Sequence, residues 1–231
     1  MSFTVEIWGD YACFSRPELK VERVSYDVIT PSAARGILEA IFWKPAIKYV
    51  IDEIRVCQPI EFENIRRNEV NSKASPREGT YIYSANDRAQ RAAMVLRNVR
   101  YVIVAHFEKG ILDERDKTED GTFNHGKFAE SITRRLRKGQ CYHMPYLGTR
   151  EFPANVRLLE EDIEIPISIS EDRDFGLMLY DMECEGTWVK RKTESDDEIW
   201  DYTRTGEFTP TYFWAVMKNG VIDLRNVEVL R

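Results

Sequence analysis

Apolar and polar side chains alternate over residues 3–8, a period of two that predicts a β-strand. From Thr30 onward, apolar residues recur at the spacing of one helix face, and Pro31 stands near the first turn, where proline is tolerated. Pro45 ends this helix, and residues 48–60 are predicted to form the second strand. The first part of the chain therefore has the order strand, helix, strand.

The middle of the chain is predicted to begin with a basic region over residues 64–79, which glycine and proline interrupt. A short helix is expected over residues 86–96. A clean alternation of apolar and polar residues then predicts a third strand over residues 99–107.

A second long helix is predicted from His125 to Lys138, after a charged loop over residues 108–120. Its apolar stripe repeats every fourth residue, and Gly139 stands where a glycine is favoured after a helix end. Residues 150–158 are predicted to form the fourth strand.

The resulting order, β-α-β-β-α-β, predicts an α+β fold with the ferredoxin-like arrangement that RNA recognition motifs share, although order alone does not imply function. We expect this domain over residues 1–160 and a β-rich C-terminal region over residues 161–231. In the C-terminal region we expect strands at residues 177–183 and 211–217, followed by an Asn-Gly hairpin turn at residues 219–220. An exposed acidic loop is expected at residues 193–201.

The net charge of −6 hides two basic stretches. Residues 64–100 carry eight Lys or Arg against three acids, and residues 125–150 carry six against one. Residues 159–207 reverse the balance, with sixteen acids and five bases. This asymmetry is typical of a protein that binds a polyanion on one surface, although solvated basic faces would look the same in the sequence.

Composition and missing motifs exclude several classes of protein. The four cysteines are scattered with no C-x-x-C pair, which indicates reduced thiols in a cytoplasmic protein and no zinc site. Neither a membrane-spanning apolar run nor a secretory signal is evident. Glycine-rich nucleotide motifs, H-E-x-x-H and G-x-S-x-G are also missing. We therefore expect no membrane partner, no cofactor and no metal, so that any catalysis would be metal-free.

The most informative segment places His125 and Lys127 at the start of the second long helix. Free backbone N–H groups attract a phosphate there. A lysine could neutralise charge on a phosphorane-like transition state, and an imidazole could move a proton to or from a ribose hydroxyl. These groups suit RNA cleavage by its own 2′-hydroxyl, which leaves a 2′,3′-cyclic phosphate. The alternative is an ordinary helix start with a solvated lysine and a surface histidine.

Other candidates combine cations with aromatic rings, a composition that suits phosphate contacts and base stacking on single-stranded RNA. Some stand at a helix end, where compensation of the helix dipole would also explain them. The candidate RNA-binding residues are Trp43, Lys44, Arg66, Arg67, Arg134, Arg135, Arg137, Lys138, Tyr146 and Arg150.

Several segments together resemble a known family. They include W-G-D-Y-A-C-F at residues 8–14, S-Y-D-V-I-T-P-S-A-A-R-G-I at 25–37, I-F-W-K-P at 41–45 and L-G-T-R-E-F-P-A at 147–154. The chain is similar in these segments to the CRISPR-associated Cas-five proteins of subtype I-C, within the RAMP superfamily of ferredoxin-like RNA binders. The likeness covers most of the chain and is weakest after about residue 162.

The resemblance implies a metal-independent endoribonuclease that cuts the CRISPR repeat transcript at the base of its hairpin. It also implies that the protein stays on the 5′ handle within a type I-C surveillance complex, beside other subunits. The family's catalytic positions fall on Phe42, Lys127 and Phe128 of this chain, where the two phenyl rings replace groups that can move a proton. His125 is the possible substitute, and a non-catalytic RNA-binding subunit of the same complex is the alternative.

Overall fold

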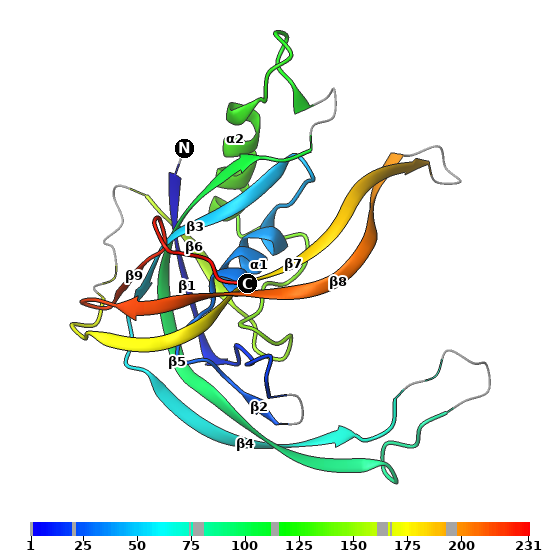
Figure 1. The fold of residues 1–231 in the computed structure, drawn as a ribbon, viewed down its shortest axis with the longest axis vertical. Coiled ribbons are helices and arrows are strands. Elements are labelled where there is room, and N and C mark those ends of the chain that lie inside the picture. Colours follow the sequence, from blue (N-terminus) through cyan, green and yellow to red (C-terminus); the bar gives the residue numbers. More distant parts are fainter. Residues whose placement is uncertain are drawn as a thin grey trace.

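The protein, seen in a computed structural model, is a mixed α/β molecule with a mostly antiparallel main sheet and two helices (Figure 1). No helix in the described part of the chain is long and apolar enough to span a lipid bilayer. For residues 184–192 and 198–207 the backbone alone is described. The described residues are 2–19, 22–73, 75, 81–111, 116–160, 166, 168–192 and 198–231.

The main sheet is built around β5 (Arg88–Lys109), whose second half lies between β1 (Ser2–Ala12) and β3 (Ile47–Val56). β6 (Asn155–Leu159) pairs with the other side of β1, and β9 (Val221–Asp223) pairs with the other side of β3. The order across the sheet is therefore β6-β1-β5-β3-β9, with antiparallel neighbours throughout.

The predicted alternation over residues 3–8 and 99–107 is confirmed in these strands. Val5 of β1 pairs with Ile103 of β5, and both side chains are fully buried on the face that the helices cover. Removing such side chains from water stabilises the fold by roughly 25 cal/mol per Å² of apolar surface. This face of the sheet therefore holds the core on which the helices rest.

Both predicted long helices are confirmed, as α1 (Pro31–Ile41) and α2 (His125–Arg137). α1 begins at Thr30, whose hydroxyl accepts a hydrogen bond from the Ala33 N–H at 3.2 Å. Such a cap satisfies one of the backbone donors that the first turn leaves free. The apolar stripe of each helix is buried, which fixes the side that each one turns to solvent.

The helix predicted over residues 86–96 is wrong, because residues 88–96 belong to the strand β5. β4 (Glu61–Val70) and the first half of β5 form a long antiparallel hairpin, and β2 (Arg23–Val24) pairs with β5 in parallel. Residues 86–96 suggest a helix in the sequence because they include Ala, Arg and Gln, which favour helices. The sequence of β4 does not suggest a strand, because it is polar on both faces and shows no period of two. Pairing across the hairpin decides the structure here, because strand preference depends on neighbouring strands.

β7 (Arg173–Lys192) and β8 (Glu198–Met217) form a separate two-stranded sheet. The predicted turn is confirmed, since Asn219 and Gly220 have φ of 48° and 74°, as a two-residue hairpin turn requires. The expected acidic loop is wrong for residues 198–201, which belong to β8. Residues 193–197 of that loop lie outside the described residues.

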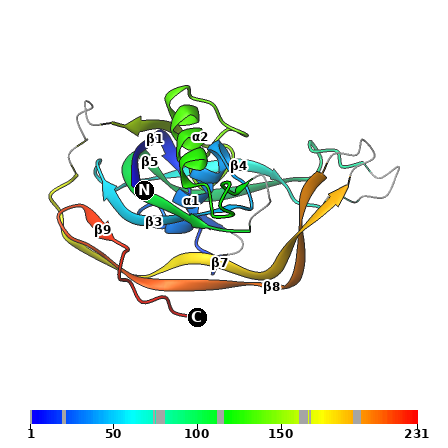
Figure 2. The same cartoon turned by 90° about the horizontal axis from the view of Figure 1, so that it is seen from above.

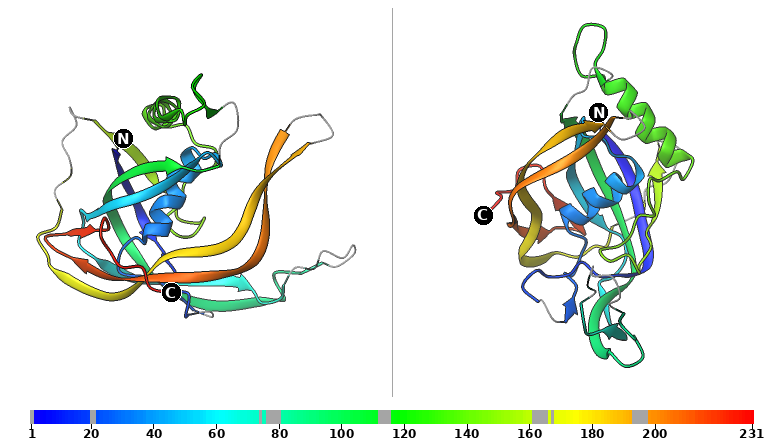
Figure 3. Two further views of the ribbon diagram at one scale, coloured as in Figure 1. Left: turned by 45° about the horizontal axis from the view of Figure 1, so that its top comes forward. Right: turned by 90° about the vertical axis from the view of Figure 1, so that its right-hand side faces the viewer.

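The β4–β5 and β7–β8 hairpins project to the same side of the molecule (Figures 1 and 2). α1 lies between the main sheet and β7, which curves past it (Figure 3). An ion pair at 2.6 Å from Arg35 Nη2 to Asp181 Oδ1 joins α1 to β7. β7 therefore forms a wall on the outer side of α1.

Candidate functional site

The start of α2 is fixed by its cap. Asn124 Oδ1 accepts a hydrogen bond from the Lys127 N–H at 3.0 Å. The predicted stripe of Phe128, Ile132 and Leu136 is buried, so the helix cannot rotate freely on the core. Residues 125–127, at the helix start, are exposed or half-buried and available to a ligand.

Two lysines share one buried carboxylate at this helix start. Asp116 Oδ1 lies 3.4 Å from Lys127 Nζ and 3.8 Å from Lys44 Nζ. The Asp116 side chain is 7% exposed, whereas those of Lys127 and Lys44 are 39% and 47% exposed. Two ammonium groups thus face one carboxylate in this Asp116 cluster (Lys44, Asp116 and Lys127). Such a cluster attracts a phosphate and holds its cations in place.

Sequence reasoning missed Asp116 and did not bring Lys44 and Lys127 together. Asp116 lies in the charged loop after β5, where neighbouring acids give no local sign of which one is buried. Lys44 follows α1 and Lys127 begins α2, so only the packing of the two helices reveals that they are neighbours.

The phenyl rings of Phe42 and Phe128 are core residues beneath this cluster. Phe128 is fully buried and Phe42 is 8% exposed, with 6.4 Å between their ring centroids. Phe123 stacks on Phe128 at 5.1 Å. Aromatic contacts of this kind stabilise a core, but a phenyl ring has no proton to give or take. The rings therefore support the helix start without supplying acid–base chemistry.

His125 is the first residue of α2, and its side chain packs on aromatic rings. Its ring lies 4.4 Å from that of Phe123, edge to face, and 5.9 Å from that of Phe107. The residue is exposed, so its imidazole can meet a ligand. Residues two apart in a helix do not share a face, so His125 and Lys127 approach a ligand from different directions.

Tyr49 is a buried tyrosine close to the site. Its hydroxyl donates a hydrogen bond to the Phe42 carbonyl oxygen at 2.7 Å. Burial raises the pKa of Tyr49 far above its usual range. This phenol is therefore a structural donor, which leaves His125 as the exposed proton-transfer candidate within α2.

The arginines near the end of α2 have different environments. Arg135 donates to the Ile41 carbonyl oxygen at 2.9 Å and lies 5.1 Å from the centre of the Phe42 ring, so it joins α2 to the end of α1. Arg137 pairs with Glu160. Arg134 and Lys138 are exposed and form no ion pair with the described residues. The last two are therefore the better phosphate ligands of this group.

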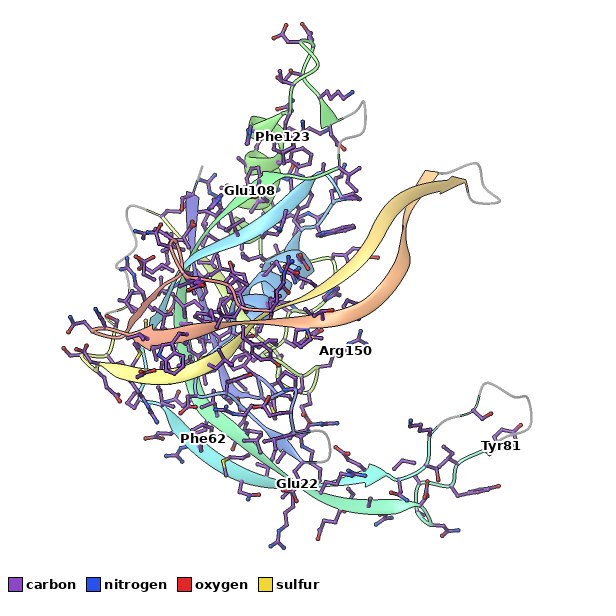
Figure 4. All side chains as sticks on the ribbon, in the orientation of Figure 1. Glu22, Phe62, Tyr81, Glu108, Phe123 and Arg150 are labelled. Atoms are coloured by element: carbon purple, nitrogen blue, oxygen red, sulfur yellow. The ribbon has the colours of Figure 1, made fainter. Side chains whose placement is uncertain are left out.

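The candidates on β4 and in the loop before β6 lie away from the start of α2. Arg67 pairs with Glu151 and lies 5.4 Å from the centre of the Phe152 ring. Arg66 and Arg150 are exposed and unpaired within the described ranges. Figure 4 places Phe123, beside the Asp116 cluster, and Arg150 in well separated parts of the molecule. The predicted cations therefore form at least two separate groups.

The two aromatic binding candidates are half-buried and belong to different surroundings. Trp43 follows α1, next to Lys44 of the Asp116 cluster. Tyr146 instead lines a pocket near the beginning of α1.

Cys13, Cys57 and Cys141 are free thiols, while the side chain of Cys184 lies outside the described residues. Within the described part, His, Cys, Asp and Glu do not gather in groups that could hold a metal ion.

Comparison with known proteins gives the class and then the family. A model of CRISPR-associated proteins matches residues 3–225, which is nearly the whole chain. The molecule is thus a CRISPR-associated protein. More narrowly, it belongs to the family described as CRISPR-associated protein (Cas_Cas5).

Two curated relatives are similar over most of their length. The protein of Mannheimia succiniciproducens named CRISPR pre-crRNA endoribonuclease Cas5d is 45% identical over 235 positions, covering 95% of this chain and 93% of that protein. The Thermus thermophilus protein of the same name is 44% identical over 178 residues, covering 77% and 72%.

Two solved structures have a similar fold. A crystal structure of a CRISPR-associated protein has a TM-score of 0.63 at 24% identity, covering 98% of this chain and 92% of that one. The functionally uncharacterized protein SMU1763c from Streptococcus mutans has a TM-score of 0.61 at 23% identity, covering 98% and 93%. At these identities the likeness concerns the fold alone.

Proposed function

We propose that this protein is an endoribonuclease that cleaves CRISPR repeat precursor RNA. The observation that carries the proposal is its 45% identity, over nearly the full length of both chains, to a protein named CRISPR pre-crRNA endoribonuclease. The site supports the same reading, because Lys127 stands at a capped helix start beside Lys44 and Asp116.

Cleavage begins when the 2′-oxygen of a ribose attacks the adjacent phosphorus. The bond from phosphorus to the 5′-oxygen of the next nucleotide breaks, which leaves a 2′,3′-cyclic phosphate and a 5′-hydroxyl end. Lys127, with Lys44 beside it, stabilises the negative charge on the phosphate oxygens in the transition state. His125 takes the proton from the 2′-hydroxyl or gives one to the departing 5′-oxygen.

A second function is favoured by the two buried phenyl rings. Phe42 and Phe128 stand where proton-transfer groups would be expected, and neither ring can act as acid or base. On this alternative the protein binds the repeat RNA without cutting it and serves as an RNA-binding subunit. The two functions differ in cleavage and not in binding, so a cleavage assay separates them.

The architecture fits the same proposal. We assign residues 1–160 to a ferredoxin-like RNA-binding domain, because β6-β1-β5-β3 and the two helices follow the order of that fold, and residues 161–231 to a β-rich extension. After cleavage the protein retains the 5′ handle and joins other subunits of a type I-C surveillance complex in the cytoplasm. The exposed cations Arg66, Arg134 and Lys138 supply phosphate contacts.

Binding to repeat RNA should weaken steeply as salt rises. If about six phosphates are contacted, the slope of log affinity against log salt is about −4, since each contact on a single strand contributes about −0.7. Replacing Arg134 and Lys138 together by alanine should make the slope shallower by one to two. A salt titration of binding by fluorescence anisotropy measures both slopes. A flat plot for the wild-type protein would contradict the proposed phosphate contacts.

The ends of the RNA fragments test the chemistry of the cut. The proposal predicts one cut in the repeat, with a 2′,3′-cyclic phosphate on the upstream fragment and a 5′-hydroxyl on the downstream one. Mass spectrometry of the fragments identifies both ends. Tight binding with intact RNA would instead support the non-catalytic alternative, and a 5′-phosphate end would contradict attack by the 2′-oxygen.

A further inference from the structure

A pocket of about 300 Å³ lies at the beginning of α1, apart from the Asp116 cluster. Its walls come from the first turns of α1, the chain after β1, the loop before β6, and β7. The lining residues are Phe14, Ser15, Thr30, Ser32, Ala33, Gly36, Ile37, Tyr146, Gly148 and Leu179.

The pocket combines an apolar floor with hydroxyl groups at its rim. Phe14 and Leu179 are buried, while Ser15 is exposed and Tyr146 half-buried. No Lys, Arg, Asp or Glu is among the lining residues, so the pocket suits a flat, neutral, partly polar group. Its volume is at the lower end of the range for small-molecule sites, which limits the occupant to about one ring system with its attachment.

The two glycines that line the pocket have different roles. A Cβ atom at Gly36 would meet nothing within 4 Å, so the missing side chain leaves free space on this face of α1. Gly148 has φ of +83°, and a Cβ there would lie 2.0 Å from the Cys13 carbonyl oxygen. Gly148 is therefore required for the close approach of two backbones, whereas Gly36 tolerates a larger side chain.

We propose that this pocket receives one unpaired nucleobase of the bound RNA, an inference that rests on the proposed function. Single-stranded RNA is commonly read through bases that leave the stack, rest on aromatic rings and form hydrogen bonds along their edges. Tyr146 provides the ring, and the hydroxyls of Ser15 and Ser32 provide donors and acceptors for a base edge. The ligand is thus a base in a single-stranded part of the repeat.

The position of the pocket predicts where this base lies relative to the cut. The pocket lies beside the first turns of α1, and Lys44 of the Asp116 cluster follows the last turn of the same helix. An eleven-residue helix is about 16 Å long. That length corresponds to about four or five nucleotides at the stacked spacing of about 3.4 Å per nucleotide, or fewer if the strand is extended. The sensitive base should therefore lie within about five nucleotides of the cleaved bond.

The test measures how wild-type protein and Gly36→Leu bind repeat RNAs in which each unpaired nucleotide in turn lacks its base. For the wild type, one abasic position near the cut should weaken binding about tenfold, because stacking on an aromatic ring accounts for about that much. Gly36→Leu adds a side chain at a lining position where a Cβ meets nothing within 4 Å, and it improves helix propensity. This variant should bind intact RNA about tenfold more weakly and no longer distinguish the abasic RNA.

Two further variants make the result specific. Glu130→Leu puts a leucine at an exposed position of α2 and should keep the wild-type difference between intact and abasic RNA. Tyr146→Ala removes the ring and should abolish that difference. This variant provides a second test if thermal melting shows that Gly36→Leu is not folded. If Gly36→Leu distinguishes intact from abasic RNA as well as the wild type does, the pocket does not bind a base. That result would leave the proposal of RNA cleavage unaffected. Absence of any repeat binding by the wild type would overturn both proposals.

Discussion

Lys127→Ala should lose at least 100-fold in the rate of repeat RNA cleavage, measured in a single turnover with enzyme in excess. Lys127 Nζ faces the buried Asp116 carboxylate beside Lys44, at the start of a capped helix where a phosphate is expected. Removing one group that stabilises charge in a transition state typically costs 10²–10³-fold in rate. Binding should weaken far less, because other exposed cations contribute phosphate contacts.

The fold should survive this change. The cap of α2 uses the backbone N–H of Lys127 and not its side chain, and Asp116 keeps Lys44 at 3.8 Å. A loss of about 1 kcal/mol would lower the melting temperature by roughly 2–4 °C in a chain of this size. Lys218→Ala, an exposed lysine in the β8–β9 turn, should cut like the wild type. Full cleavage by a folded Lys127→Ala protein would exclude this lysine from the mechanism.

His125→Ala should slow cleavage by about 100-fold and leave affinity for repeat RNA nearly unchanged. A positioned acid or base contributes roughly 10²–10⁴-fold to a rate, and His125 is the exposed imidazole at the start of α2. Because the residue is exposed, alanine leaves room for a small molecule. Added imidazole should therefore restore part of the lost rate in the same single-turnover assay.

Rescue separates a chemical role of His125 from a structural one. A merely structural histidine, packed on Phe123, would give a slow variant that imidazole does not help. His143→Gln, at an exposed histidine in the loop after α2, serves as the matched control and should keep the wild-type rate. An unchanged rate in His125→Ala would show that another group moves the proton, or that none is needed.

The sequence predicted the parts of the fold in which one face is buried. Strands β1 and β5 show a period of two where they cover the core, and α2 shows its stripe of Phe128, Ile132 and Leu136. Such segments carry the signal because burial selects apolar residues at fixed spacing. The helix boundaries were also close, since Thr30 and Asn124 are residues that prefer to cap helices.

The β4–β5 hairpin could not be predicted in the same way. Side chains on β4 alternate between exposed and half-buried, so neither face selects apolar residues strongly. The partner segment of β5 has a composition that favours a helix in isolation. Ten cross-strand residue pairs, from Glu61–Arg97 to Val70–Arg88, hold it extended. These pairs join segments up to 36 residues apart, which a local pattern does not reveal.

The candidate site was only partly accessible from the sequence. Lys127 was found because a lysine at a helix start has a local signature, and the family resemblance marked the same position. Asp116 was missed because its burial and its two lysine partners depend on tertiary packing, which a local pattern does not show. Arg135 and Arg137 are predicted RNA-binding cations whose side chains both have partners within the protein. Arg135 meets the end of α1 and Arg137 meets Glu160, contacts that the charge pattern does not distinguish from exposed arginines.

The most direct test of the central claim is incubation of the pure protein with its own repeat RNA in EDTA, followed by a denaturing gel. We expect one cut near the base of the repeat hairpin, with a 2′,3′-cyclic phosphate end, at the same rate with and without the chelator. RNA that is bound tightly but stays intact, with or without added magnesium, would contradict it. That result would mean that the two phenyl rings, Phe42 and Phe128, mark a site that holds RNA and no longer cuts it.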